Sequence, residues 1–233
     1  MLRLSEPSLA WEYLRRNVNY REDWAQRHGA DASDPAARWQ LETLEDPIHD
    51  ARVAHPVWRV DPRSRAKLRA AEPSQGDHEP FSMWNIAGPK RLVHDGRQLL
   101  LNGYAGSELL HLALGSDVQD GGPFEYVLSP SADIGDQWRT VQTQQQLLRA
   151  PHATAAVAFT RPTRLALWHM RALQALDGAD EGASQREIAT SVFGEEIAVA
   201  NWHPDSELRA QVRHLLRRAR SLTAGGYRRL ISI

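Results

Sequence analysis

Four arginines recur at helical spacing near the end of the chain: Arg209, Arg213, Arg217 and Arg220. With 3.6 residues per turn, these four positions fall on one side of a helix. A guanidinium can donate two parallel hydrogen bonds to a phosphate or to the edge of a guanine. The spacing of this arginine stripe therefore predicts a helix face that binds nucleic acid.

The helix that carries the arginine stripe is predicted to begin at Asp205 or Ser206 and to run to about Leu222. Its apolar residues form a separate stripe at about 100° per residue, which predicts a buried face. Between Asp205 and Arg229, seven arginines stand against two acids, so this stretch is locally basic. The buried face would consist of Leu208, Val212, Leu215, Leu216, Ala219 and Leu222.

Two shorter helices are predicted before it. The first runs from about Thr163 to Leu176, with Pro162 at the first helical position and Gly178 just past the end. The second opens with the capping box Ser184-Gln185-Arg186-Glu187 and ends at Gly194. A capped helix, a turn and a longer helix with apolar and arginine faces are typical of a helix-turn-helix.

The candidate DNA-binding residues come from the start of the second helix, from the third helix and from the segment after it. The N-terminal half of the third helix is favoured for the major groove, and Phe193 and Trp202 are expected in the core. Two alternatives remain open: arginines that only solvate a helical bundle, or an arginine face that meets an acidic partner protein. The candidates are Ser184, Gln185, Arg186, Ser206, Arg209, Arg213, Arg217, Arg220, Arg228 and Arg229.

The charge of the whole chain indicates that any basic surface is local. The 233 residues carry a net charge of only −1. From Arg161 onward there are eleven arginines and eight acids, so the rest of the chain is acidic. Nearly all basic residues are arginine; Lys67 and Lys90 are the two lysines.

Motifs that could support catalysis are absent from the sequence. There is no cysteine, no pair of histidines at metal-ligand spacing, no glycine-rich phosphate loop and no nucleophile elbow. We therefore expect no enzymatic activity, no metal and no cofactor. No signal peptide and no apolar run of about 20 residues occurs either. This predicts a cytoplasmic protein that does not contact a membrane.

The first quarter of the chain is predicted to be helical and rich in tryptophan. Ser8 and Asn19 are candidate caps of two helices, Asp34-Pro35 begins a third, and Asp61-Pro62 begins one that leads through Leu68. Trp11, Trp24, Trp39 and Trp58 lie in this part. We expect them to build a small core, and the alternative is an aromatic docking surface for another protein.

The middle of the chain predicts a small antiparallel sheet with one helix. Asp95-Gly96 marks a hairpin between residues 91–94 and 97–101, and Asn102-Gly103 marks a second turn. Further strands are expected at residues 111–114 and 124–128. An amphipathic helix is expected over residues 134–148.

Together these patterns predict an α+β chain with four consecutive parts. Residues 1–71 form a helical domain, residues 72–80 a polar linker, residues 81–158 the β-rich region and residues 159–233 a three-helix DNA-binding domain. Because the arginine excess lies at one end, a fragment that begins at Phe81 is expected to bind DNA without activating transcription.

Longer motifs at both ends carry a family resemblance. The segment Trp11–Asn17 with Tyr20-Arg21 and Asp23-Trp24 resembles a bacterial transcriptional regulator-like domain, as do residues 39–47 and 57–59. Residues 173–178, 182–189, 205–213 and 225–228, with Phe193-Gly194 and Trp202, resemble its usual partner domain. Val18 replaces an expected turn residue, and residues 195–201 are expected to form a variable loop.

Together the two domains are similar to the FseA-type activators of proteobacterial integrative and conjugative elements. The resemblance implies an activator of genes for excision and transfer, with promoter DNA as its partner. The candidate protein partners are RNA polymerase, for which direct contact is left open, and an anti-activator of the QseM type, which is a short relative of the C-terminal domain alone.

Overall fold

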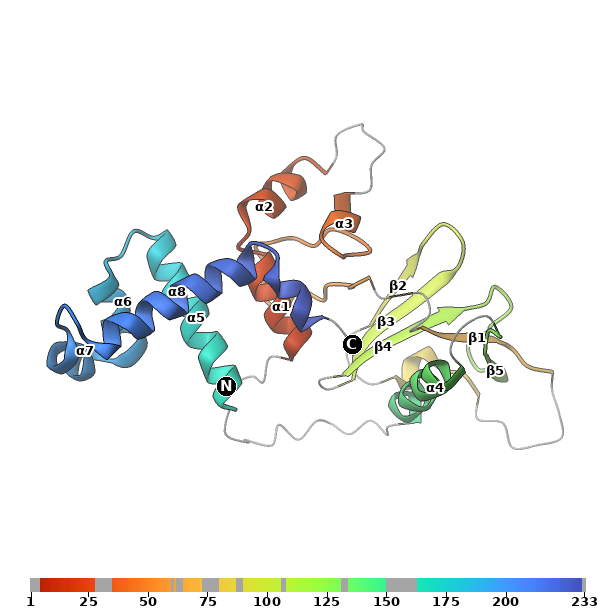
Figure 1. Cartoon of the computed structure of the whole chain (residues 1–233). Helices are drawn as coiled ribbons and strands as arrows, with labels where there is room; N and C mark the ends of the chain where they lie inside the picture. The colour runs from red at the N-terminus through yellow and green to blue at the C-terminus, as the bar shows by residue number, and fades with distance from the viewer. Residues whose placement is uncertain are drawn as a thin grey trace. The chain divides into compact units, whose positions relative to one another are not determined.

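The computed structural model describes residues 5–27, 35–59, 61, 65–72, 80–86, 90–105, 108–130, 134–149 and 163–231. The fold is α+β, as predicted, and the chain divides into two compact units that are both discontinuous in sequence (Figure 1). The helical unit comprises Met1–Asp31, Glu45–Ala54 and Phe159–Ile233. The sheet unit comprises Ala32–Leu44 and His55–Ala158. The expected linker lies almost wholly outside the described residues, at 73–79.

The sheet unit is built on five strands in the order β2-β3-β4-β1-β5. The sheet is mixed and not purely antiparallel as predicted, because β1 runs parallel to β4 and antiparallel to its other neighbour, β5. Each remaining pair of neighbouring strands is antiparallel. The strands are β1 (Ala66–Ala70), β2 (Lys90–His94), β3 (Leu99–Ala105), β4 (Glu108–Leu114) and β5 (Phe124–Val127).

The helix predicted to lead through Leu68 is wrong, because these residues form strand β1. Ala66 and Leu68 are buried, whereas Lys67 and Arg69 are exposed. This alternation has the period of two that places successive side chains on opposite faces of a sheet. The start expected at Asp61-Pro62 lies partly outside the described residues, since Pro62 is not among them.

The hairpin predicted at Asp95-Gly96 is confirmed as the β2–β3 connection. The Asp95 carboxylate accepts hydrogen bonds from the amides of Arg97 (2.8 Å) and Gln98 (2.9 Å), and Gly96 adopts a φ of +91°. The turn predicted at Asn102-Gly103 is wrong. Both residues are buried inside β3, where Asn102 pairs with His111 of β4 and contacts its Nδ1 at 2.7 Å.

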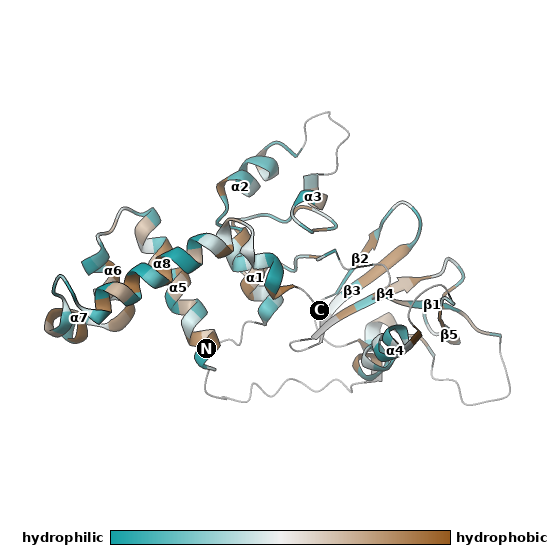
Figure 2. Cartoon of the chain, viewed as in Figure 1, coloured by the Kyte–Doolittle hydropathy of each residue, from teal (hydrophilic) through white to brown (hydrophobic). Residues whose placement is uncertain are grey.

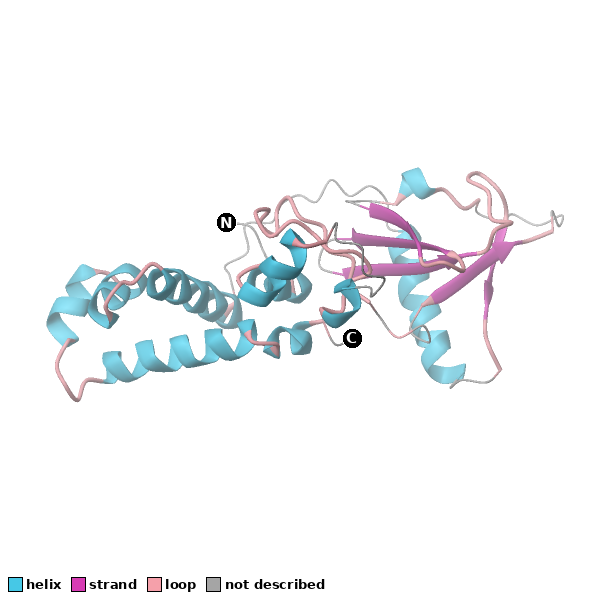
Figure 3. Ribbon diagram, turned by 90° about the horizontal axis from the view of Figure 1, so that it is seen from above, coloured by secondary structure: helices cyan, strands magenta, loops and turns pink. Residues whose placement is uncertain are grey.

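Helix α4 (Ile134–Arg149) covers one face of the sheet, which confirms the predicted amphipathic helix (Figure 3). Val141 of α4 packs in one buried cluster with residues of β1, β3 and β4, and in Figure 2 the β3 ribbon is strongly hydrophobic. Two short helices complete the described part of this unit, α3 (Pro35–Arg38) and η2 (Met83–Asn85).

The C-terminal part of the helical unit contains four α-helices where three were predicted. The additional helix is α7, which occupies the residues expected to form a variable loop. Gly194 ends α6 with a φ of +96° and directly precedes α7, so no loop separates them. The four helices are α5 (Arg164–Asp180), α6 (Gln185–Phe193), α7 (Glu195–Asn201) and α8 (Glu207–Thr223), followed by η3 (Gly226–Leu230).

Helix α5 is longer at its C-terminal end than predicted. Its N-cap is Thr163, and Pro162 lies outside the described residues. Gly178 does not end the helix but lies within it, where a Cβ atom would come 3.3 Å from the Ile188 side chain of α6. The left-handed residue that follows the helix is Gly182, with a φ of +86°.

Helices α1 (Glu6–Leu14) and α2 (Val18–Ala25) form the N-terminal part of the helical unit. Their caps are Ser5 and Asn17, which accept hydrogen bonds from the amides of Ser8 and Tyr20. The predicted caps, Ser8 and Asn19, are therefore wrong, since each lies a few residues after the actual cap. Pro7 explains the first case, because proline is tolerated in the first turn of a helix.

The four N-terminal tryptophans do not share one core. Trp11 is fully buried in the helical unit, whereas Trp39 and Trp58 are buried in the sheet unit. Trp24 is half-buried, and the guanidinium of Arg27 lies 3.7 Å from the centre of its ring. The predicted burial is confirmed for three of the four, but the prediction of one small core is wrong.

Candidate nucleic-acid interface

Helix α8 separates its apolar and basic residues as predicted. All the predicted apolar residues except half-buried Leu222 are buried. Arg213, Arg217 and Arg220 are exposed, and in Figure 2 the α8 ribbon alternates between hydrophilic and hydrophobic segments. At about 100° per residue these three arginines span an arc of about 60° and rise about 10 Å along the axis. They form one basic strip on the outside of the unit.

Arg209 and Ser206 occupy different surroundings from the other three arginines. Ser206 is buried and caps α8, accepting a hydrogen bond from the Arg209 amide at 3.2 Å. Arg209 is half-buried; it donates to the Pro204 carbonyl at 3.0 Å, and its guanidinium lies 5.7 Å from the Trp202 ring centre. Both residues hold the turn before α8 in place, so the outward basic strip consists of Arg213, Arg217 and Arg220.

The predicted capping box at the start of α6 is confirmed. The Ser184 hydroxyl accepts from the Glu187 amide at 3.3 Å, and the Glu187 carboxylate accepts from the Ser184 amide at 2.7 Å. Hydrogen bonding of the Glu187 carboxylate to the Ser184 side chain and amide lowers the pKa of Glu187. Ser184, Gln185 and Arg186 are all exposed. A helix start leaves amides without intrahelical acceptors, so this end of α6 presents donors that an anion can use.

The two remaining candidates lie in η3, beyond the C-terminal end of α8. Arg229 is exposed, whereas Arg228 is half-buried with its guanidinium 5.4 Å from the Tyr227 ring centre. Tyr227 is fully buried, and this burial raises its pKa to about 12. The ten candidates therefore occupy three places in the helical unit: the start of α6, the length of α8 and the turn of η3.

Contacts from the N-terminal segment, which carries α1 and the cap of α2, reach both α5 and α8. Tyr13 Oη lies 2.9 Å from His169 Nδ1 of α5, and both residues are buried. Asn17 donates to the Thr223 carbonyl at the end of α8, at 2.8 Å. The N-terminal segment is thus part of the scaffold that carries the basic strip.

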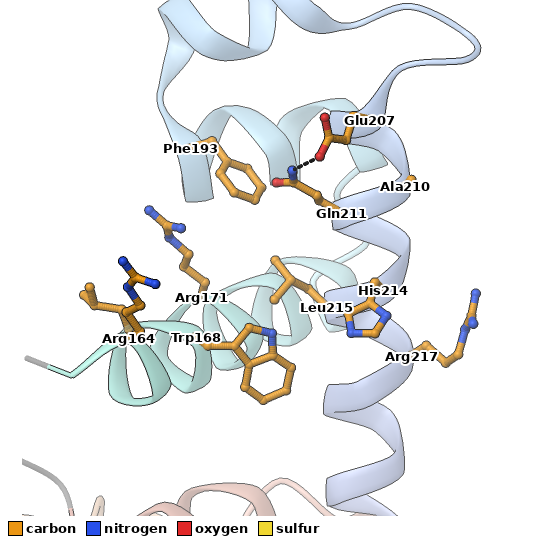
Figure 4. Close-up of a pocket in the computed structure, with 11 residues that line it drawn as sticks. Arg164, Trp168, Arg171, Phe193, Glu207, Ala210, Gln211, His214, Leu215 and Arg217 are labelled. Atoms are coloured by element: carbon orange, nitrogen blue, oxygen red, sulfur yellow. Dashed lines mark hydrogen bonds between the residues drawn. The ribbon is translucent and has the colours of Figure 1, made fainter.

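A groove that no sequence pattern predicted lies between α5 and α8. Figure 4 shows Trp168 of α5 and Leu215 of α8 beside it, with Phe193 of α6 on the opposite side. The volume is about 660 Å³. Phe193, expected in the core, is only half-buried here, and Trp202 is half-buried as well. The spacing of Arg164, Trp168 and Arg171 puts them on one face of α5, and this spacing is the sequence feature that could have indicated the groove.

Among the described residues, no group of three or more His, Cys, Asp or Glu side chains could hold a metal ion. Within the same ranges, no helix is both long and apolar enough to cross a membrane.

Three family profiles match parts of the chain. Residues 1–43 match a proteobacterial transcriptional regulator-like domain, and residues 127–232 match a DNA-binding domain described as that of a T6SS transcription factor. Residues 66–104 match a domain of unknown function. No curated protein matches the chain. The chain is therefore similar to a transcription regulator at one end and to a transcription-factor DNA-binding domain at the other, and these similarities identify it as a DNA-binding regulator.

Proposed function

We propose that the chain is a transcriptional activator that binds promoter DNA through α8 and the start of α6. The observation that carries this proposal is the exposed strip of Arg213, Arg217 and Arg220 inside the segment that matches a DNA-binding domain. Duplex DNA carries one negative charge per about 1.7 Å of axis, so a strip about 10 Å long faces several phosphates.

In this proposal the N-terminal half of α8 enters the major groove, which is wide enough to admit a helix. The strip of Arg213, Arg217 and Arg220 contacts phosphates, together with Arg228 and Arg229 of η3. The start of α6 binds a further phosphate through the amides near Gln185 and Arg186. Arg209 and Ser206 support the turn that positions α8, so we leave them out of the contact surface.

The target genes in this proposal are those for excision and transfer of an integrative and conjugative element. The similarity of both ends of the chain to FseA-type activators supports this assignment. RNA polymerase and a QseM-type anti-activator are the protein partners that the same similarity implies. The proposal includes a cytoplasmic location and no enzymatic activity.

Sequencing of the DNA fragments that co-purify with the protein from cells tests the proposal. The expected result is enrichment of one shared site upstream of excision or transfer genes. A reporter driven by that site should be activated when the protein is expressed. If the arginine face instead binds an acidic protein, no DNA fragment is enriched over a control purification from cells that lack the protein.

A further inference from the structure

The groove between α5 and α8 has an apolar floor. Leu167, Trp168, Phe193 and Leu215 contribute apolar side chains to it from three different helices, and Figure 4 labels the last three. Trp168 and Phe193 are only half-buried, so their rings remain accessible from the groove. Such a floor favours a ligand with an aromatic or aliphatic body, because its binding removes apolar surface from water.

Three arginines line the same groove: Arg164, Arg171 and Arg217. All three are exposed, and none forms an ion pair with a carboxylate among the described residues. Arg171 lies 5.3 Å from the Phe193 ring centre, so a cation stands beside the apolar floor. The acid that lines the groove, Glu207, accepts a hydrogen bond from Gln211 at 3.3 Å. The lining therefore favours an anion.

We propose that this groove is a regulatory site for a small anionic ligand, an aromatic or aliphatic body that carries a carboxylate, sulfonate or phosphate. Its volume of about 660 Å³ lies within the range of about 300–1,000 Å³ for small-molecule sites. Eleven residues line it, whereas a stable protein interface uses about 20–30 residues on each side. The size of the groove thus favours a small molecule over a protein partner.

The position of Arg217 couples this site to the proposed DNA surface. Arg217 belongs both to the groove lining and to the basic strip, so an anion bound beside it competes with a phosphate for the same guanidinium. Linkage requires that bound DNA lowers the affinity for the ligand by the same factor by which the bound ligand lowers the affinity for DNA. The coupling rests on the proposed function, but the binding site does not.

Titration of the full chain with 8-anilinonaphthalene-1-sulfonate tests the binding site. N-phenyl-1-naphthylamine is the matched probe, because it has the same aromatic body without the sulfonate. We expect one saturable site for the sulfonate, with affinity about tenfold lower in the double variant Arg164→Gln/Arg171→Gln. Affinity for the uncharged probe should change little. The control Arg97→Gln/Arg139→Gln removes two exposed arginines of the sheet unit and should leave both affinities unchanged.

Equal sulfonate affinity in the double variant and the wild type overturns the proposal. So does displacement of the sulfonate by an acidic amphipathic helical peptide that binds more tightly than either probe, since this identifies a protein-docking surface. The coupling is measured separately, as DNA affinity with and without the sulfonate in the wild type and in Arg164→Gln/Arg171→Gln. We expect the sulfonate to weaken DNA binding in the wild type and not in the double variant. Sulfonate binding with unchanged DNA affinity refutes the coupling and keeps the site.

Discussion

Tyr13 Oη and His169 Nδ1 meet at 2.9 Å in the interior of the helical unit, although 156 residues separate them in the sequence. Beside them, Arg16 donates to both carboxylate oxygens of Asp177, at 2.6 and 2.8 Å. Burial opposes the charge of Arg16, but its hydrogen bonds to Asp177 and Glu12 outweigh this effect and raise its pKa. The two ends of the chain therefore form one folded unit around the α5–α8 pair.

The first prediction concerns the buried hydrogen bond. Tyr13→Phe leaves the Nδ1 atom of His169 without its partner in a buried position. The free energy of unfolding should fall by about 1–3 kcal/mol. The double variant Tyr13→Phe/His169→Leu removes both polar groups and should recover part of the loss. Urea unfolding measures both, and an unchanged midpoint for Tyr13→Phe would show that this contact adds nothing to stability.

The second prediction replaces the expectation that a fragment beginning at Phe81 binds DNA. Such a fragment lacks α1, whose Trp11, Tyr13 and Leu14 are fully buried, and it lacks the interior strand β1. We predict that it loses cooperative unfolding and binds DNA at least tenfold more weakly than the full chain. Calorimetry and a gel shift check this. A folded fragment with full DNA affinity would contradict the scaffold role of the N-terminal segment.

The third prediction concerns the cap of α6. Ser184→Ala should cost about 0.5–2 kcal/mol, whereas Ser184→Asp should keep the cap and the melting temperature. We expect DNA affinity to fall in Ser184→Asp, because the start of α6 is proposed to bind a phosphate and the added carboxylate would repel it. Ser5→Asp is the control, because Ser5 caps α1 in the same unit and should leave DNA affinity unchanged. Full DNA affinity in Ser184→Asp would reduce Ser184 to a structural cap.

The fourth prediction concerns the pH dependence of stability. Burial, aided by the charge of Arg65, lowers the pKa of His111 from 6.5 to about 4. The unfolded state therefore binds a proton at a higher pH than the folded state. The contribution of neutral His111 to the free energy of unfolding is fully present above pH 6.5. It is lost as the pH falls towards 4, by about 3 kcal/mol in total.

Unfolding by denaturant across this pH range measures the effect. His111→Asn should unfold more easily than the wild type near pH 7 and show a smaller fall in stability between pH 6.5 and 4. His203→Asn, a change at an exposed histidine, should keep the wild-type profile. An equal fall in stability in the wild type and in His111→Asn would contradict the assignment of this pH dependence to His111.

Local features of the helical unit could be predicted from the sequence. The box of Ser184 and Glu187, the end of α6 at Gly194 and the buried face of α8 depend on residues within a few positions of each other. The Asp95-Gly96 hairpin is local in the same way. In such cases the type and spacing of neighbouring residues decide the backbone conformation.

Features that depend on distant contacts could not be predicted in this way. Asn102-Gly103 has the composition of a turn, but pairing of Asn102 with His111 places it inside a strand. Gly178 has the composition of a helix end, but the close approach of Ile188 explains its position within α5. The packing of Tyr13 on His169 leaves no local signal in either segment. The groove could not be predicted because its lining comes from three helices.

The central claim is that the basic strip of α8 contacts DNA phosphates, and the salt dependence of DNA affinity tests it most directly. In Arg213→Ala/Arg217→Ala, affinity should fall and the slope of log affinity against log salt should lose about 1.8, or about 0.9 for each phosphate contact. The melting temperature should not change, since both side chains are exposed. The control Arg97→Ala/Arg139→Ala should retain the wild-type slope. An unchanged slope and affinity in Arg213→Ala/Arg217→Ala, with the fold intact, would contradict the claim.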